Sequence, residues 1–395
     1  MPPLTTSNPF RIHGVVSEQF FTDRAQEIDR ILKTLREPAA KLIVYGPRRM
    51  GKTSALVRAI ERHEASGGVA FLADMSTAST LVDIGNRILG AAGPVLGRRW
   101  ADSIGEFVKR IGVAITLTPD VRTGLVLPSL DVTLRSASLE DQRHTLTRTL
   151  DAIEALAEAR HTPVGIVLDE FQEINRYGGD SAEWHLRGII QHHQHVSYVL
   201  AGSQGHIIER MLDKGRAFYG LADQLQFGPI DDRHLSAWID DRMTQGGVQA
   251  RDIGKVVVAM AGPRTRDIVQ VARQCFDNCR AAAHATEADV GLAFDDVVAE
   301  QEALLQSLWT GLTATQQNVL RAIAAQLTGL TTRASIKRFG LPSSGAAANT
   351  ARAMIEAGNL VKSASRTGYS FENPFFCRWV ARETMGDLGA APPDR

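Results

Sequence analysis

The segment LIVYGPRRMGKTSALVRAI, which begins at Leu42, holds a glycine-flanked loop between an apolar run and a helical pattern. The loop fits G-x-x-x-x-G-K-[ST] at every position. Its glycines permit a tight turn and let backbone N–H groups face phosphate oxygens, while the lysine and threonine supply a positive charge and a Mg²⁺ ligand. We therefore predict a nucleotide-binding loop whose members are Gly46, Pro47, Arg48, Arg49, Met50, Gly51, Lys52, Thr53 and Ser54.

Two further groups of polar residues follow apolar runs. Asp169 and Glu170 come directly after VGIVL, and Ser203 and Gln204 come after VLAG. We expect Asp169 to hold Mg²⁺ through water and Glu170 to polarise an attacking water molecule. A polar side chain at 203 or 204 would then sense the terminal phosphate, so these four residues and the loop lysine form the predicted catalytic set.

The elements that would position these residues alternate between strand and helix. The expected strands cover 41–45, 69–75, 164–169, 196–202 and a short stretch from 223, and helical patterns separate them. Strands that alternate with helices indicate a parallel sheet with crossover helices, hence an α/β core over residues 1–230. Residues 113–134 differ, because alternation and turn signals there favour a β-hairpin insertion.

The remainder of the chain is predicted to be mainly helical. We expect a helical lid over 231–305, a unit of three helices and a two-strand wing over 306–382, and a disordered tail over 383–395. Residues 311–380 contain eight Lys and Arg but two Asp and Glu, a local charge that suits phosphate. Candidate DNA contacts are Arg333, Lys337, Arg338, Arg352, Lys362 and Arg366, although units of this kind also dock proteins.

Four segments resemble one known family, the archaeal-type ATPases related to AAA+ and STAND nucleotide hydrolases. They are FFTDRAQEIDRI, YGPRRMGKTSAL, VLDEFQEI and VLAGSQGHIIERML, and the C-terminal YSFENPFFCRWV also resembles the end of these proteins. The resemblance covers about residues 10–380. It implies a P-loop core with a helical lid and a C-terminal winged helix, and it implies ATP and Mg²⁺ as cofactors.

The same resemblance suggests roles for several other residues. Segment 20–27 would pack near the adenine, and Arg264 or Arg266, after Gly262-Pro263, would reach the γ-phosphate as a second sensor. The chain departs from the family pattern at Asp23, where a glycine is expected, and at Leu221, where a basic residue is expected. The missing basic residue could have given an arginine finger to a neighbouring copy, and Arg216 is a candidate substitute for it.

Composition limits the classes of function. With 44 basic and 44 acidic side chains, the whole chain has no bias toward nucleic acid, so any such bias is local. Three cysteines give no disulfide framework, and we expect a cytoplasmic protein without a membrane span. His192, His193 and His195 could bind zinc, but their place at a helix end favours a structural role.

These observations predict an ATP-binding and ATP-hydrolysing P-loop ATPase. Its nucleotide state would control the lid or a homo-oligomer, and its winged helix would bind duplex DNA. The alternative is a slow nucleotide-dependent signalling switch whose winged helix docks a protein partner. A replication-initiator-like loader would share the architecture but would need origin contacts that the sequence does not reveal.

Overall fold

The computed structural model describes residues 7–12, 14, 20–100, 102, 107, 139–203, 205–326 and 329–384. The chain divides into two compact units, one formed by His13–Ile230 and the other by Met1–Ile12 with Asp231–Arg395. The predicted hairpin at 113–134, Gln204 and the tail from 385 onward lie outside the described residues. None of the described helices is long and apolar enough to cross a membrane.

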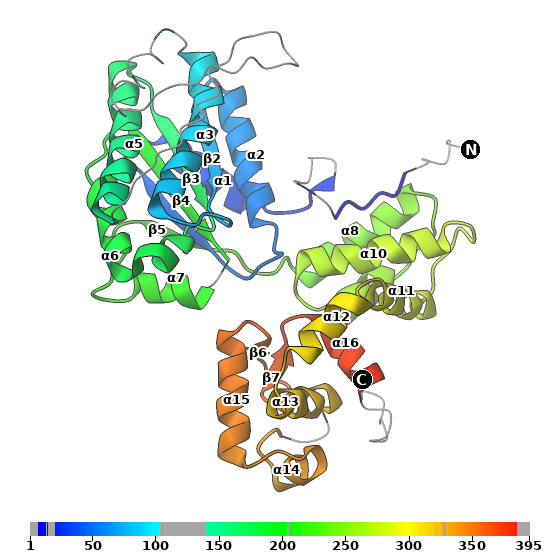
Figure 1. The fold of residues 1–395 in the computed structure, drawn as a ribbon. Helices are drawn as coiled ribbons and strands as arrows, with labels where there is room; N and C mark the ends of the chain where they lie inside the picture. Colours follow the sequence, from blue (N-terminus) through cyan, green and yellow to red (C-terminus); the bar gives the residue numbers. More distant parts are fainter. Residues whose placement is uncertain are drawn as a thin grey trace. The chain divides into compact units, whose positions relative to one another are not determined.

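The unit His13–Ile230 is built on a five-stranded parallel sheet of order β2-β3-β4-β1-β5 (Figure 1). The strands are β1 (Lys41–Tyr45), β2 (Val69–Asp74), β3 (Val164–Asp169), β4 (Val196–Gly202) and β5 (Asp223–Gln226). Strand β4 lies between β1 and β3 although it follows both in the chain. In register, Tyr45 pairs with Gly202, and Asp74 pairs with Asp169. The carboxyl ends of these strands therefore lie at one edge of the sheet.

Helices cover both faces of this sheet (Figure 1). Leu42 and Val44 pack toward α1 (Ala25–Arg36) and α2 (Lys52–Ala65). Ile43, between them in the chain, belongs to the core on the other face. That core includes residues of α3 (Leu81–Arg99), α5 (Leu139–Ala159), α6 (Glu173–Ile190) and the short α7 (Gly205–Leu212). Burial on both faces explains why the strands read as apolar runs in the sequence.

The second unit begins with a helical part. It comprises α8 (Asp232–Gln245), α9 (Ile253–Ala261), α10 (Thr265–Cys279) and α11 (Glu287–Glu300). Phe10 packs edge-on against Trp238 and Phe276, with ring centroids 5.6 and 6.4 Å away. This aromatic contact explains why the first described residues of the chain belong to this unit.

A smaller cluster of helices and two strands completes the second unit. It contains α12 (Glu302–Thr310), α13 (Ala314–Ala325), α14 (Arg333–Phe339), α15 (Ser344–Glu356), β6 (Leu360–Lys362), β7 (Tyr369–Phe371) and α16 (Pro374–Glu383). Strands β6 and β7 pair antiparallel, and Gly368, with φ of 79°, lies in the turn between them. Three helices followed by a two-strand wing are the elements of a winged helix.

Candidate nucleotide site

The glycine-flanked loop joins β1 to α2, as its spacing requires. Gly51 precedes the first residue of α2 with φ of 90°, a left-handed conformation that a side chain would disfavour. A Cβ atom on Gly46 would lie 2.2 Å from the carbonyl oxygen of Phe227, so only glycine fits there. The loop thus directs the amino end of α2, which attracts anions, toward the edge of the sheet.

Lys52 is the first residue of α2 and is buried within this loop. Its Nζ donates hydrogen bonds to the carbonyl oxygens of Gly46 at 2.8 Å and Pro47 at 2.7 Å. Burial lowers the pKa of Lys52 to about 8, although the carboxylates of Glu170 and Asp169 favour its charged form. Both hydrogen bonds go to neutral carbonyl oxygens, so a phosphate group would add a negatively charged acceptor in direct contact.

Thr53 and Asp169 bring two hard oxygen atoms together at the same edge. The Thr53 hydroxyl donates to Oδ2 of Asp169 at 2.7 Å. Burial raises the pKa of Asp169, and the hydrogen bond from Thr53 acts in the opposite direction. A hydroxyl and a carboxylate are the donors that Mg²⁺ uses beside nucleotide phosphates, so this pair fits that ion.

Glu170 leaves β3 in a left-handed conformation, with φ of 55°. Its backbone N–H donates to Oδ1 of Asp169 at 3.0 Å, and this bond fixes the Asp169 carboxylate against the backbone of the turn. The hydroxyl of Ser203, directly after β4, donates to Oε2 of Glu170 at 2.7 Å. The Nε of Arg48 in turn donates to the Ser203 hydroxyl oxygen at 3.2 Å. The insertion of β4 between β1 and β3 therefore places Ser203 between the phosphate loop and the carboxylates.

Gln172 is a site residue that the sequence reasoning did not single out. It is buried, and its Nε2 donates to the same Oε2 atom of Glu170 at 2.5 Å. The sequence signal that could have found it is its position two residues after Glu170, in the turn that leads to α6.

Arg24 also contributes to the site through contacts with backbone atoms. It is 3% exposed and has φ of 73°, and its Nη2 donates to Gly228 O at 2.6 Å and to Met50 O at 3.3 Å. Its guanidinium carbon lies 4.5 Å from the centre of the Phe227 ring. Arg24 therefore ties the phosphate loop to the segment that follows β5. The sequence marked this residue only through the family resemblance.

Arg264, the predicted second sensor, belongs to the other unit, where it is buried in an ion-pair cluster. Its Nη1 lies 2.6 Å from Oε1 of Glu372, and its Nε lies 2.9 Å from Oδ2 of Asp267. These bonds connect α10 to the segment between β7 and α16. The predicted contact with a γ-phosphate stays a prediction.

Arg216, the suggested substitute for a missing basic residue, is also paired within its own unit. Its guanidinium bonds the carboxylates of Asp180 and Glu183, both on α6. The predicted role of Arg216 stays a prediction.

The histidines before β4 have structural partners. His193 is buried, and its ring nitrogens lie 2.7 Å from the Tyr198 hydroxyl and 3.0 Å from Oδ1 of Asp151. The Nδ1 of His195 lies 3.0 Å from Oε1 of Glu154. Both imidazoles therefore bond to carboxylates of α5. The described residues include no group of three or more His, Cys, Asp or Glu side chains placed to bind a metal ion.

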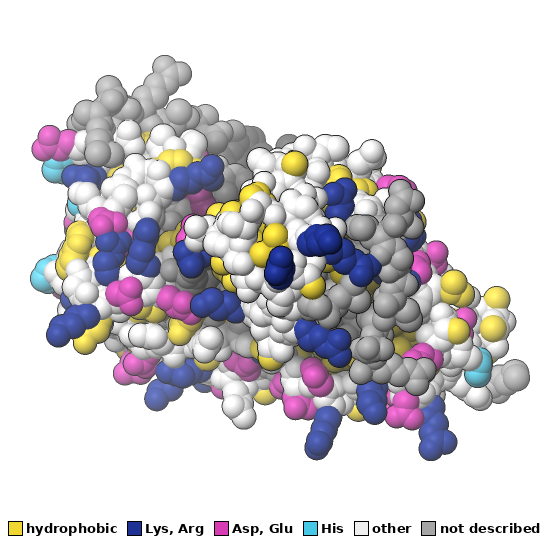
Figure 2. Space-filling model, turned by 90° about the horizontal axis from the view of Figure 1, so that it is seen from below, with side chains coloured by type: hydrophobic (Ala, Val, Ile, Leu, Met, Phe, Trp, Pro, Cys, Tyr) yellow, Lys and Arg dark blue, Asp and Glu magenta, His cyan; other side chains and the backbone are white. Residues whose placement is uncertain are grey.

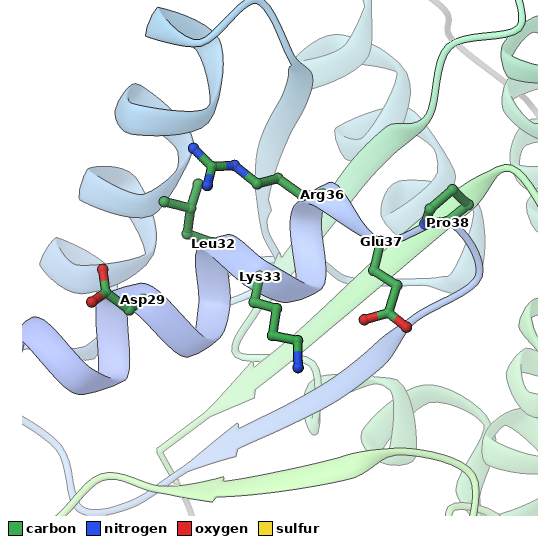
Figure 3. Close-up of a pocket in the computed structure, with 6 residues that line it drawn as sticks. All are labelled: Asp29, Leu32, Lys33, Arg36, Glu37 and Pro38. Carbon is green, nitrogen blue, oxygen red and sulfur yellow. The ribbon is translucent and has the colours of Figure 1, made fainter.

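A shallow groove on α1 lies outside the nucleotide site. It is lined by Asp29, Leu32, Lys33, Arg36, Glu37 and Pro38 (Figure 3). These residues extend from the middle of α1 past its carboxyl end, which leads into the start of β1. The phosphate loop follows the other end of β1, so the groove and the loop lie at opposite edges of the sheet.

Comparisons with known proteins agree with this architecture. A family model described as an ATPase domain predominantly from Archaea matches residues 21–245. The Walker-type ATPase paby2304 of Pyrococcus abyssi has a similar structure, with a TM-score of 0.64 and 14% identity over 94% of this chain and 99% of that one. No match was found among the curated proteins.

Two proteins of Aeropyrum pernix are also similar in fold. The ORC1 protein, solved in complex with DNA, has a TM-score of 0.50 and 16% identity over 91% of this chain and 92% of that one. The ORC2 protein has a TM-score of 0.53 and 15% identity over 91% and 93%. Together with the strand order, these likenesses confirm the predicted fold class, a P-loop α/β core with a helical C-terminal region.

Proposed function

We propose that this chain, which belongs to the family of ATPase domains found predominantly in Archaea, binds ATP with Mg²⁺ and hydrolyses it at the loop between β1 and α2. The observation that supports this most directly is the convergence of Lys52, Thr53, Asp169, Glu170 and Ser203 at one edge of the sheet. A lysine, a hydroxyl–carboxylate pair and a second carboxylate are the parts that phosphoryl transfer from ATP to water requires.

Each of these side chains has a role in the proposed reaction. Lys52 would exchange its bonds to loop carbonyls for bonds to the β- and γ-phosphates, which would give its buried charge a directly bonded negative partner. Thr53 and Asp169 are the residues that would hold Mg²⁺, and the ion would supply positive charge beside the phosphates. Glu170 would accept a proton from the water that attacks the γ-phosphorus in line with the departing ADP oxygen.

The second unit would deliver the output of this cycle by binding duplex DNA. The six candidate residues Arg333, Lys337, Arg338, Arg352, Lys362 and Arg366 are all exposed, on α14, α15 and the wing. Figure 2 views the molecule from the side on which α14 and α15 lie in Figure 1, and Lys and Arg side chains with few Asp and Glu beside them lie near the centre of that view. The similarity in fold to ORC1, a protein solved in complex with DNA, gives this proposal further support.

Turnover of ATP measured across protein concentration, with and without duplex DNA, tests the proposed function. Lys52→Ala is the blank, because it removes the ammonium group that the phosphates need. We expect turnover that rises with DNA and with protein concentration, as for a DNA-engaged ATPase completed by contacts between copies. ATP binding without turnover under every condition would instead favour a nucleotide-dependent switch whose winged helix binds a protein partner.

A further inference from the structure

The side chain of Gln172 occupies a position that is costly for an amide. It is 2% exposed and lies beneath the last residue of β4, where a Cβ atom on Gly202 would be 2.2 Å from its Oε1. Burial of an amide costs free energy unless its hydrogen bonds are made. The absence of a side chain at Gly202 leaves the space that the Gln172 amide fills. In this position the amide nitrogen points to Glu170, in the turn after β3.

Capping of the following helix does not explain this placement. Gln172 stands at the N-cap position of α6, but its side chain makes no capping bond to that helix. Its Nε2 donates instead to Oε2 of Glu170. The amide is thus directed to the carboxylate that would act as the general base.

A second donor binds the same carboxylate oxygen. Ser203 donates to Oε2 of Glu170 at 2.7 Å, while Arg48 of the phosphate loop donates to Ser203. Two donors on one oxygen fix both the position and the rotation of a carboxylate. The other oxygen, Oε1, takes part in neither of these bonds.

We propose that Gln172 is a positioning residue for ATP hydrolysis, an inference that rests on the function proposed above. Gln172 and Ser203 anchor Oε2 of Glu170, so that Oε1 is held ready to accept a proton from the attacking water. In this step the water oxygen forms a bond to the γ-phosphorus, the bond from that phosphorus to the ADP oxygen breaks, and the proton passes to Oε1. Phosphate and ADP are the products.

The test combines turnover with an independent measurement of ATP binding. Gln172→Met keeps the length of the side chain but removes the donor, and Gln172→Glu replaces the donor with a second carboxylate. We expect each to reduce kcat by about 10- to 100-fold, as for the loss of a hydrogen bond to a charged group. The Kd for a fluorescent ATP analogue should stay within about twofold of wild type, because Gln172 makes no bond to the phosphate loop.

Two controls separate positioning from general damage to the fold. Gln191→Leu removes an exposed glutamine at the other end of α6 and should leave kcat unchanged. In a Glu170→Gln background, Gln172→Met should cause no further loss, because the two residues act as one unit. Thermal unfolding of each variant shows whether the chain remains folded.

Several results would overturn the inference. Unchanged turnover in Gln172→Met would remove the positioning role, and increased turnover would mean that Gln172 holds Glu170 back. A loss that persists in the Glu170→Gln background, or a loss of ATP binding, would indicate a structural role only. A wild-type protein without turnover would overturn the proposed hydrolysis together with this inference, whereas an active wild type beside an equally active variant would overturn this inference alone.

Discussion

The two units of the molecule arrange their charged residues in opposite ways. In His13–Ile230, side chains of the phosphate loop and of the turns after β3 and β4 form hydrogen bonds with one another. In the second unit, the six exposed basic residues are dispersed over α14, α15 and the wing. The first arrangement is a cluster of side chains that bond to one another, and the second is a set of separate exposed charges.

This difference follows from the chain path. Parallel strands that lie side by side bring their carboxyl ends to one edge, so polar residues that follow such strands must meet. Residues on the outer faces of short helices have no such constraint, because packing fixes only their buried side. The chemistry of the first unit is therefore better defined by the structure than the binding partner of the second.

The largest expected effect is a loss of ATP turnover in the first unit without a loss of its fold. Glu170→Gln removes the proton acceptor but keeps the size of the side chain, so turnover should fall by about 10²- to 10⁴-fold. The Kd for ATP should change little, because Lys52, Thr53 and the loop remain.

Glu173→Gln is the matched control, since Glu173 begins α6 three residues later and pairs with Arg176 instead. An equal loss of turnover in both variants would contradict the assignment of Glu170 as the base.

The next prediction concerns the stability of the second unit and its dependence on the buried ion pairs of Arg264. Arg264→Ala would remove the ion pairs to Glu372 and to the fully buried Asp267, and should destabilise this unit by about 3–5 kcal/mol. Arg378→Ala breaks a more exposed pair with Asp295 and should cost about 0–1 kcal/mol. Denaturant unfolding would measure both, followed by the emission of Trp238, Trp309 and Trp379 after the other two tryptophans are replaced with Phe.

Equal destabilisation by the two arginine variants would mean that burial does not decide the strength of these pairs. An effect on ATP turnover without a change in stability would instead support the predicted sensor role of Arg264.

A smaller effect is expected on the stability of the first unit when the pH is lowered. Burial, and next the nearby Arg36, lower the pKa of His63 below its ordinary value. Because the unfolded chain then binds a proton more readily, stability should fall as pH drops below about 6.5, by up to about 1.4 kcal/mol per unit. Above that pH both states are neutral at His63, and this contribution vanishes.

Unfolding midpoints between pH 5 and 8, followed by the emission of Trp100 and Trp184 alone, would measure this change. His63→Leu should flatten the dependence, while His144→Asn, at an exposed position, should not. A dependence that survives in His63→Leu would assign it to other groups.

The smallest effect tests the dispersed surface. Lys337→Ala and Arg338→Ala should each reduce DNA affinity a few-fold and lower the slope of log affinity against log salt by about 1, as for single phosphate contacts. Lys33→Ala, on α1 of the other unit, is the control for charge alone. Fluorescence anisotropy with a labelled duplex at several salt concentrations gives both quantities, and slopes equal to that of wild type would exclude these side chains as contacts.

Much of the architecture could be predicted from the sequence. Apolar runs that end in Gly46 and Asp169 identify β1 and β3, and the family resemblance is confirmed by the match over residues 21–245. The roles of Lys52, Glu170 and the other site residues stay predictions that the experiments above test.

Other features could not be predicted, because they depend on distant contacts. Arg24 acts through carbonyl groups of Met50 and Gly228, and no residue type marks a carbonyl in a sequence. Gln172 is buried because Gly202, thirty residues away, has no side chain. The ion pair of Arg264 with Glu372 joins residues 108 positions apart. These contacts exist only after the core has packed.

The close approach of Gly46 to Phe227 has a consequence for evolution. Any side chain at 46 would collide with the backbone of the neighbouring segment, whether or not a nucleotide is ever bound. Purifying selection for a folded domain would therefore keep this glycine even in a descendant that no longer bound a nucleotide. In such descendants Lys52 and Glu170 would be free to change, whereas Gly46 would be retained because the fold itself requires a glycine there.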